Sequence, residues 1–287
     1  MTNRLTKAEF TNLGKIMYPE AKITKAQTIE YYIRMAPAML DLLHDRPLVL
    51  TRFPNGINRE SFYEKDAPLG APSWIKTFRK YSEAAERDIN YVLCNDLDTL
   101  IWLANLAALE IHVTLSKATS LENPDLLLFD LDPQPPASFD DVVSVALLLK
   151  ETLEELGLKS FTKTSGKRGL HIVVPIVSEY SYRQTREFVH LIGKHLVRRS
   201  EIVVSEFSRE KKPGTIYIDY LQNSHGRTMV SPYSLRATPE ATVSTPIDWK
   251  DVKKGLKPET LNLFTVPNIN ERPWEGMLRD SQRLDVD

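Results

Sequence analysis

Four stretches of the chain carry apolar residues at the three- and four-residue spacing of an amphipathic helix. The first follows Thr24, which stands three residues before Gln27 and so has the spacing of a capping box. Pro37 lies inside this stretch and is expected to bend the helix. The apolar side of this helix is predicted to consist of Ile29, Ile33, Ala36, Leu40 and Leu43.

The other three stretches have recognisable end signals as well. Asx and Ser residues favour helix starts, and Gly favours a stop. Helices are therefore predicted from Asn95 or Asp96 through Trp102 to about Ala108, from the cap Ser138 to the stop Gly157, and from about Tyr182 to Val197.

Strand patterns lie between these helices. Residues 110–115 alternate apolar and polar, and residues 126–132 form the apolar run of a buried strand. Residues 160–163 and 170–176 flank a Gly-containing turn, and residues 215–221 form another apolar run. The order strand–helix–strand–turn–strand–helix–strand predicts a mixed α/β (α+β) sheet with helices packed against it.

Composition narrows the class of protein. The length of 287 residues allows one large domain or two small ones. A single cysteine, Cys94, rules out a disulfide framework or a cysteine-based zinc site within one chain, which fits a reducing compartment. The N-terminus has no apolar signal core and no window approaches a membrane span, so a cytoplasmic protein is expected.

The net charge of −1 does not by itself indicate a nucleic-acid binder, because such domains are often strongly basic. Phosphate binding would have to come from local patches. Three local clusters of Lys and Arg could supply it, although a solvated surface is the simpler interpretation of each cluster. The clusters are Lys76–Arg79–Lys80, Arg198–Arg199 and Arg209–Lys211–Lys212.

Two aspartates lie at the end of the second predicted strand, in LLLFDLDP. Residues two apart on a strand are ~6.6 Å apart on the same face, so Asp130 and Asp132 would share a face while Leu131 turns to the core. Two negative charges this close favour a cation between them, and Mg²⁺ and Mn²⁺ prefer oxygen ligands. The DxD spacing alone more often marks a solvated strand end or a helix cap.

Asp219 is a lone acid inside the predicted strand IYIDY, and an unpaired Asp is rarely buried. Three carboxylates at strand ends could form a two-ion site for phosphoryl transfer. Asp96 and Asp98 have the same spacing as the strand pair, but they precede a helical pattern and are predicted to cap it.

The turn SGKRG joins two strands and is followed by His171. Glycines permit positive φ, and the amides of such a turn can hold phosphate oxygens, with Ser165, Lys167 and Arg168 adding donors. A simple hairpin with a basic tip is the alternative, and a core histidine is the alternative for His171 and for His112.

Further candidates lie outside these motifs. Gln222 and Asn223 follow Asp219, and Arg236 in SPYSLRA could bind a triphosphate. Near the N-terminus, aromatic faces and lysines are the groups that bind bases and phosphates, although spacing alone favours one core aromatic and scattered surface cations. This N-terminal set is Lys15, Lys25, Arg52, Phe62 and Tyr63.

Together these motifs resemble the polymerase domain of bacterial and archaeal DNA ligase D, a branch of the archaeo-eukaryotic primase superfamily, in a stand-alone form. The match extends over about residues 10–280. Each motif alone is weak, whereas this many in order is strong. The motifs are KIMYP, RFPNG, FYEKDAP, NDLDTLIWLANLAALEIH, FDLDP, SGKRGLH, YIDYLQN and SPYSLRA.

The resemblance implies a role for each candidate residue. The catalytic residues, which would bind two divalent ions, Mn²⁺ or Mg²⁺, are Asp130, Asp132 and Asp219. The nucleotide would be held by His112, Ser165, Lys167, Arg168, His171, Gln222 and Arg236. DNA and a 5′-phosphate would be bound by Lys15, Lys25 and Arg52, with Phe62 and Tyr63 stacking on or splaying the template. Residues 209–214 lie where the family has a mobile loop.

It also implies a primase-polymerase fold with an RRM-like catalytic sheet flanked by helices. A single domain over residues 1–287 is expected, with a DNA-binding part at about 1–120 and a catalytic part at about 121–287. Two positions depart from the family pattern, because Arg168 stands where Lys is common and Tyr63 where Phe is common.

The implied activity is that of a template-directed, metal-dependent DNA/RNA polymerase. It would fill gaps and extend ends at double-strand breaks in non-homologous end joining, prefer ribonucleotides and recognise a 5′-phosphate. Its partners would be NTP or dNTP, DNA with gaps or overhangs, Ku and a separate DNA ligase, in a nucleoid-associated location without a membrane. The alternatives are a non-catalytic end-binding module that recruits a ligase, a primase that starts strands de novo, and a metal-dependent nuclease.

Overall fold

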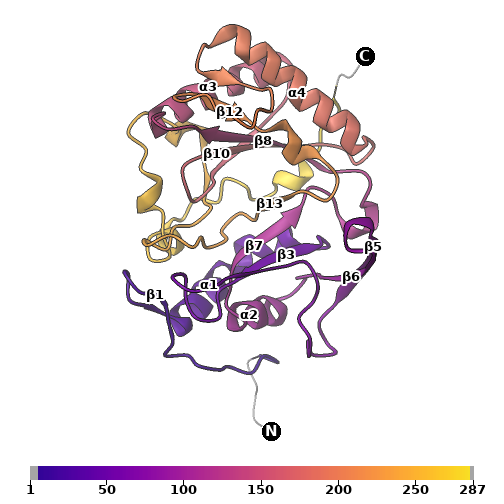
Figure 1. The fold of residues 1–287 in the computed structure, drawn as a ribbon, viewed down its shortest axis with the longest axis vertical. Helices are drawn as coiled ribbons and strands as arrows, with labels where there is room; N and C mark the ends of the chain where they lie inside the picture. The colour runs from indigo at the N-terminus through magenta and orange to yellow at the C-terminus, as the bar shows by residue number, and fades with distance from the viewer. Residues whose placement is uncertain (1–5, 285–287) are drawn as a thin grey trace. The chain divides into compact units, whose positions relative to one another are not determined.

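A computed structural model describes residues 6–284 and divides the chain into two compact units (Figure 1). Unit 1 contains the chain up to Thr114 together with Val230–Val243 and Thr260–Asn270. Unit 2 contains Leu115–Met229, Ser244–Glu259 and the chain from Glu271. The chain therefore enters unit 2 after Thr114 and returns to unit 1 twice.

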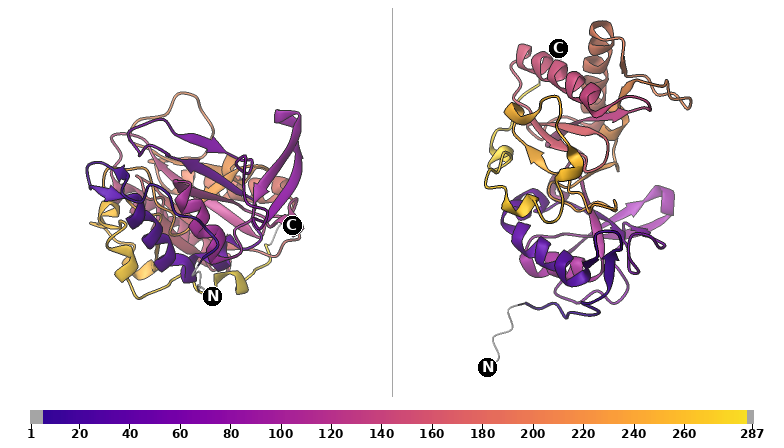
Figure 2. Two further views of the ribbon diagram at one scale, coloured as in Figure 1. Left: turned by 90° about the horizontal axis from the view of Figure 1, so that it is seen from below. Right: turned by 90° about the vertical axis from the view of Figure 1, so that its left-hand side faces the viewer.

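Unit 1 is built on a four-stranded sheet in the order β13-β7-β3-β4. Its sheet strands and helices are β3 (Leu48–Arg52), β4 (Phe62–Glu64), β7 (Ala108–Thr114), α1 (Lys25–Leu43) and α2 (Leu97–Asn105), with β13 (Thr228–Val230) where the chain returns from unit 2. Two ribbons complete it: β1 (Ile16–Tyr18) with β2 (Ile23–Thr24), and β5 (Thr77–Ser82) with β6 (Arg87–Val92). The β5–β6 ribbon extends away from the rest of unit 1 (Figure 2).

Unit 2 is built on a six-stranded sheet in the order β11-β12-β8-β10-β9-β14. All neighbouring strands are antiparallel except β11 and β12, which are parallel. The strands are β8 (Leu126–Pro133), β9 (Phe161–Thr164), β10 (Leu170–Pro175), β11 (Val203–Val204), β12 (Ile216–Ile218) and β14 (Pro246–Ile247), and the helices are α3 (Phe139–Glu155) and α4 (Tyr182–Arg199).

Both helices of unit 2 pack on one face of this sheet, as Figure 1 shows. Leu127, Phe129 and Leu131 of β8 are fully buried in a cluster with apolar residues of α3 and α4. Since side chains alternate along a strand, the even-numbered residues of β8 face the opposite side of the sheet. This predicted mixed α/β architecture, a sheet flanked by helices, is confirmed.

Helix starts follow the predicted cap chemistry. Thr24 and Gln27 form the capping box of α1, and Ser138 forms one with Asp141 at the start of α3. Gly157 follows α3 with a φ of 71°, a conformation that glycine adopts without steric cost. Short 3-10 turns connect the remaining segments: η1 (Glu83–Ala85), η2 (Ala118–Ser120), η3 (Tyr220–Asn223), η4 (Trp249–Asp251), η5 (Pro258–Thr260), η6 (Val266–Asn268) and η7 (Met277–Arg279).

The predicted apolar face of α1 is wrong at one position. Ile33 is 40% exposed, whereas Tyr31 and Tyr32 are almost completely buried. The two tyrosines can be buried because each hydroxyl donates to a backbone carbonyl, of Tyr233 and Leu109 respectively, at 2.7 Å. The helix therefore turns its tyrosines rather than Ile33 inward.

The predicted strand over residues 215–221 is also too long. Strand β12 ends at Ile218, and Asp219 accepts a hydrogen bond from the Leu221 amide as the N-cap of η3. An Asp side chain competes with strand pairing by bonding nearby backbone amides, which accounts for the early end. Within residues 6–284, none of the helices combines the length and apolar character that crossing a bilayer requires.

Candidate active site

Asp130 and Asp132 lie on β8, on the sheet face opposite α3 and α4. Leu131 between them is fully buried on the helix side, so the predicted alternation is confirmed. In the sheet register Asp130 stands opposite His171 of β10, and Asp132 stands opposite Tyr217 of β12. The pair is therefore flanked by one strand on each side.

Asp219 reaches the same region from the end of β12. Its backbone amide donates to the Asp130 carbonyl at 3.0 Å, which places the two residues side by side. Its carboxylate accepts hydrogen bonds from the Tyr217 hydroxyl at 3.2 Å, the Leu221 amide at 3.0 Å and Gln222 Nε2 at 3.3 Å. The structure thus brings the predicted Gln222 to Asp219.

Negative charge accumulates where the strands end. The pKa of Asp132 is raised, first because the protein displaces water from part of its carboxyl and second because of the charge of Asp219, although the residue as a whole is exposed. Lys211 and Arg168 oppose this rise. The pKa of Tyr217 is raised by burial and then by Asp219. A carboxylate whose pKa is raised by a neighbouring carboxylate favours a bound cation.

The donor set fits a hard divalent ion in kind. Carboxylate oxygens are the ligands that Mg²⁺ and Mn²⁺ prefer, and the repulsion between Asp132 and Asp219 is the electrostatic signature that a cation would relieve. Within residues 6–284, however, no three His, Cys, Asp or Glu side chains are already arranged around one ion position. Asp130 Oδ1 lies 3.3 Å from His171 Nε2, and Asp219 is occupied by its local hydrogen bonds. The metal site therefore stays a prediction.

The Gly-containing turn packs directly on the strand that carries the acids. Ser165 Oγ accepts from the amides of Lys167 at 3.2 Å and Gly169 at 3.1 Å, so its side chain holds the turn together. A Cβ on Gly169 would lie 2.4 Å from the Leu131 carbonyl oxygen, so only glycine fits. Lys167 and Arg168 are exposed, and the influence of Arg168 on the Asp132 pKa places its charge near the acids.

His171 has a partner that the sequence analysis missed. Lys163 of β9 is fully buried, and its Nζ lies 2.9 Å from His171 Nδ1 and 2.6 Å from Ser244 Oγ. Lys163 and His171 are paired across β9 and β10. The signal available in the sequence was a lysine inside the strand run SFTKT.

His112 and Arg236 lie in unit 1, where the structure brings them together around Glu110. Arg236 Nε donates to Glu110 Oε1 at 3.1 Å, and His112 Nε2 lies 3.5 Å from Glu110 Oε2. Glu110 and Arg236 are both buried. Sequence reasoning used Glu110 only as the start of a strand, and the assignment of His112 and Arg236 to nucleotide binding stays a prediction.

The three predicted DNA-binding cations gather in unit 1. Lys15 Nζ donates to the Pro54 carbonyl at 2.8 Å, and Lys25 Nζ donates to the Thr11 carbonyl at 2.7 Å. The pKa of Lys25 is lowered, first by burial and then by the positive charges of Lys15 and Arg52. Mutual repulsion among cations is the feature expected of an anion-binding surface.

Arg52 is held in an ion pair within unit 1. Its Nη1 donates to both carboxylate oxygens of Glu64 at 3.0 and 2.9 Å, and its Nε donates to the Leu106 carbonyl. Phe62 and Tyr63 lie on β4, the edge strand of the sheet, and are 44% and 61% exposed. Exposed aromatic rings of this kind can stack on bases.

The second DxD pair behaves as predicted. Asp96 is the N-cap of α2 and accepts from the Thr99 amide at 2.8 Å. Asp98 accepts from Thr6 Oγ1 at 2.7 Å and from the Lys7 amide at 3.0 Å. This pair fixes a helix start and an N-terminal segment.

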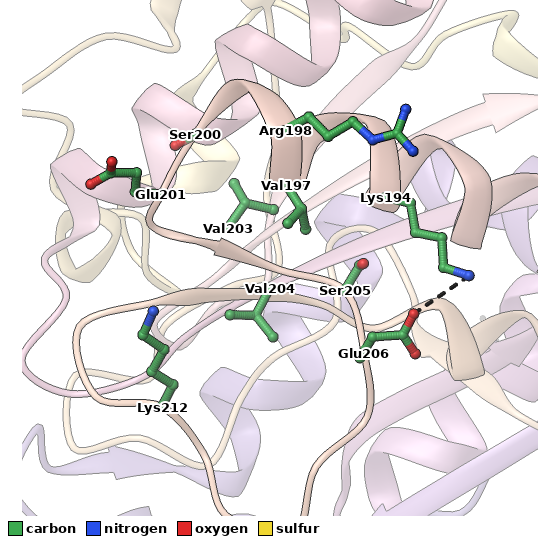
Figure 3. A pocket seen from close by; sticks show the side chains of 10 residues that line it. All are labelled: Lys194, Val197, Arg198, Ser200, Glu201, Val203, Val204, Ser205, Glu206 and Lys212. Carbon is green, nitrogen blue, oxygen red and sulfur yellow. Dashed lines mark ion pairs between the residues drawn. The ribbon is translucent and has the colours of Figure 1, made fainter.

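The basic clusters differ in their surroundings. Arg199 forms ion pairs with Glu151 and Glu155, as expected of a solvated surface. Arg198 and Lys212 line a groove of about 620 Å³ between α4, β11 and the following loop, where Lys194 pairs with Glu206 at 3.5 Å (Figure 3). None of the three candidate aspartates lines this groove.

Lys211 is an exposed residue of its cluster, and its charge lies close to the candidate acids. Its Nζ lies 4.0 Å from the centre of the Tyr217 ring, and its charge lowers the pKa of Asp132. A cation from the loop after β11 therefore stands near the acids.

Comparisons with known proteins identify the family and the fold. The model of the family "LigD, primase-polymerase domain" matches residues 24–274. The bifunctional non-homologous end joining protein LigD of Bacillus subtilis is 34% identical over 268 residues, covering 93% of this chain and 42% of the relative. The multifunctional non-homologous end joining protein LigD of Mycolicibacterium smegmatis is 29% identical over 252 residues, covering 87% of this chain and 33% of the relative.

Among solved structures, the polymerase domain of Mycobacterium tuberculosis ligase D, in complex with DNA, superposes with a TM-score of 0.88 at 28% identity. The alignment covers 96% of this chain and all of that chain. The chain therefore matches one whole polymerase domain, while it spans less than half the length of the two relatives above.

Proposed function

The chain belongs to the LigD primase-polymerase family, and we propose that it is a metal-dependent nucleotidyltransferase that extends a DNA strand from a template. Its setting would be gap filling and end extension during non-homologous end joining, the process named in its relatives. The observation that carries the proposal is that Asp132 and Asp219 lie close enough at the ends of adjacent strands, beside a basic turn, for the charge of Asp219 to raise the pKa of Asp132.

The side chains at this site supply binding and positioning. Two divalent ions, Mn²⁺ or Mg²⁺, would when bound activate the primer 3′-hydroxyl and neutralise the departing pyrophosphate. Asp130, Asp132 and Asp219 would hold them. Lys167 and Arg168 at the exposed tip of the turn would bind triphosphate oxygens, leaving the chemistry mainly to orientation and charge stabilisation.

Recognition of DNA is proposed for the N-terminal surface in unit 1. Lys15 and Lys25, whose charges repel each other, would bind a 5′-phosphate at a gap or overhang. Phe62 and Tyr63 would stack on the template. A DNA complex is known for the similar M. tuberculosis domain. Ku, a separate DNA ligase and a preference for ribonucleotides complete the proposal as family expectations.

A gap-filling assay tests the activity. The protein is incubated with a gapped, 5′-phosphorylated duplex, Mn²⁺ and labelled ribo- or deoxynucleotides. Extension with a preference for ribonucleotides supports the proposal, whereas shortening of the primer indicates a nuclease and binding without extension indicates an end-binding module. Products on a template without a primer would indicate de novo priming.

The double change Asp130→Ala, Asp132→Ala should abolish extension, because it removes two of the three proposed ion ligands. The matched control is Asp96→Ala, Asp98→Ala, which removes the same spacing of acids from the α2 cap. That control should lose about 1 kcal/mol of stability at the cap and keep extension. Full extension by the first variant would contradict the assignment.

A further inference from the structure

A chain of buried polar contacts runs behind the proposed catalytic acids in unit 2. Ser244 Oγ lies 2.6 Å from Lys163 Nζ, Lys163 Nζ lies 2.9 Å from His171 Nδ1, and His171 Nε2 lies 3.3 Å from Asp130 Oδ1. Ser244 and Lys163 are fully buried and His171 is 6% exposed. The last member, Asp130, is one of the three acids.

The direction of the first hydrogen bond follows from Ser244. Its hydroxyl has one proton, which it donates to the Thr164 carbonyl at 2.9 Å. Toward Lys163 the Ser244 oxygen can therefore only accept. Lys163 Nζ is the donor in this contact.

The direction of the second hydrogen bond follows from Lys163. A lysine ammonium has three N–H groups and no acceptor, so it donates to His171 Nδ1 as well. An imidazole whose Nδ1 accepts carries its proton on Nε2. The Nε2–H of His171 then faces Asp130 and acts as the donor there.

The backbone holds these groups in place. Lys163 pairs with His171 on one side and with Pro246 on the other, so its strand is fixed between β10 and β14. The Thr164 amide donates to the Thr245 carbonyl at 2.9 Å, which anchors the segment that carries Ser244. Such a support leaves His171 little freedom to rotate or change tautomer.

We propose that Lys163, held by Ser244, is a positioning residue that fixes His171 in the Nε2–H tautomer, with this N–H turned toward Asp130. The His171 N–H is thereby presented as a donor beside the acids, where the triphosphate of a nucleoside triphosphate would bind. The last step rests on the proposed function, whereas the tautomer and its dependence on Lys163 do not.

Nitrogen-15 NMR of the histidine-labelled protein tests the tautomer without measuring any activity. Long-range spectra at about pH 8, above the ordinary histidine pKa of about 6.5, distinguish a protonated nitrogen from an accepting one. The chain has 6 histidines, and the signals missing from His171→Gln identify those of His171. We expect Nδ1 as acceptor and Nε2 as N–H. The opposite tautomer, which a neutral Lys163 amine accepting from Nδ1–H would produce, overturns the proposal.

Three variants test the dependence on Lys163. In Lys163→Met the donor is lost, and His171 should shift to a mixture of tautomers. Lys163→Arg retains hydrogen-bond donors and should keep more of the wild-type His171 tautomer than Lys163→Met does. Thr162→Val removes a buried hydroxyl from the same strand, one that bonds Ile247 instead, and should leave the His171 signals unchanged. Unchanged His171 signals in folded Lys163→Met would also overturn the proposal.

Nucleotide kinetics then separate this proposal from the proposed function. Loss of a group that orients a functional histidine typically costs about 10–100-fold in affinity or activity. Lys163→Met should therefore raise the KM for the nucleotide at least about tenfold, and Lys163→Arg should bring the KM part of the way back to the wild-type value. An unchanged KM alongside the tautomer change rejects the positioning role. A wild-type protein without extension activity rejects the proposed function while the tautomer result stands. If Lys163→Met does not fold, Ser244→Ala takes its place, because it removes one acceptor that holds Lys163. The His171 signals should then shift toward a mixture of tautomers, and unchanged signals would overturn the proposal.

Discussion

Gly169 offers the sharpest test of how the turn is tied to the acids. A Cβ at this position would lie 2.4 Å from the carbonyl oxygen of Leu131, which is the residue between Asp130 and Asp132. The added Cβ is bonded directly to the backbone and the Leu131 oxygen belongs to the backbone, so no side-chain rotation can relieve the clash. Gly169→Ala therefore forces the turn and β8 apart.

The displacement can be worked from the geometry. Ordinary van der Waals contact of a Cβ begins at about 3.4 Å, so the two backbones must separate by roughly 1.0 Å (3.4 minus 2.4). A 1 Å displacement of positioning groups can cost about 100-fold in rate. Overpacking of this kind costs about 1–3 kcal/mol of stability, which a domain of this size can tolerate. We expect a folded protein with kcat/KM for gap filling reduced about 100-fold.

Gly157→Ala is the matched control for stability. Gly157 follows α3 with a φ of 71° and has nothing within 4 Å of a built Cβ, so alanine there costs about 1–2 kcal/mol by backbone strain alone. The assay compares the thermal midpoint and kcat/KM of both variants. Equal loss of kcat/KM in the two, or wild-type kcat/KM in folded Gly169→Ala, would refute the reasoning.

Two further predictions follow from buried charge and a buried thiol. Lys25→Ala should reduce the preference for 5′-phosphorylated over unphosphorylated gaps about tenfold, because it removes the free energy of about one charge-assisted hydrogen bond. The exposed control Lys22→Ala should keep the preference, and an unchanged preference in Lys25→Ala would reject the phosphate site. Cys94 is fully buried, and burial raises the pKa of its thiol. A thiol reagent should therefore label the native protein at least about a thousandfold more slowly than the guanidinium-unfolded chain. Comparable labelling rates would show that this part of unit 1 opens readily.

The pattern of apolar residues was sufficient for the helices and for the central strands of unit 2, but it predicted no strand before residue 110. Strands β8 and β10 and helices α1, α3 and α4 lie close to their predicted ranges, because each has a strong period and clear caps. Errors occurred where a side chain overrode the period. Tyr31 and Tyr32 enter the core because their hydroxyls find carbonyl acceptors, and Asp219 ends β12 by capping the next turn. Hydropathy does not encode either effect.

Candidate substrate-binding residues could be named from the sequence, whereas the residues that support them could not. Asp130, Asp132 and the turn stand in short motifs, and their strand context together with the family resemblance suggested a chemistry that spacing alone did not. Lys163 supports His171 only because β9 and β10 pair in one particular register. A shift of one residue would turn Lys163 to the other face of the sheet, so its role cannot be predicted before the register is known.

The same reasoning explains why Glu110 was missed. Glu110 joins His112 and Arg236, which are 124 residues apart in the chain (236 minus 112), and its carboxylate also accepts from the Ala237 amide at 3.1 Å. A buried carboxylate beside a buried guanidinium is stable only when both are well hydrogen-bonded, so the local geometry must be specific. Sequence motifs thus identify the charged residues that are candidates for binding substrate. Buried ion pairs such as Glu110–Arg236 and contacts such as Lys163–His171 determine how rigidly the side chains of such residues are held. Variants of the supporting residues should therefore change the orientation of the site before they change its charge.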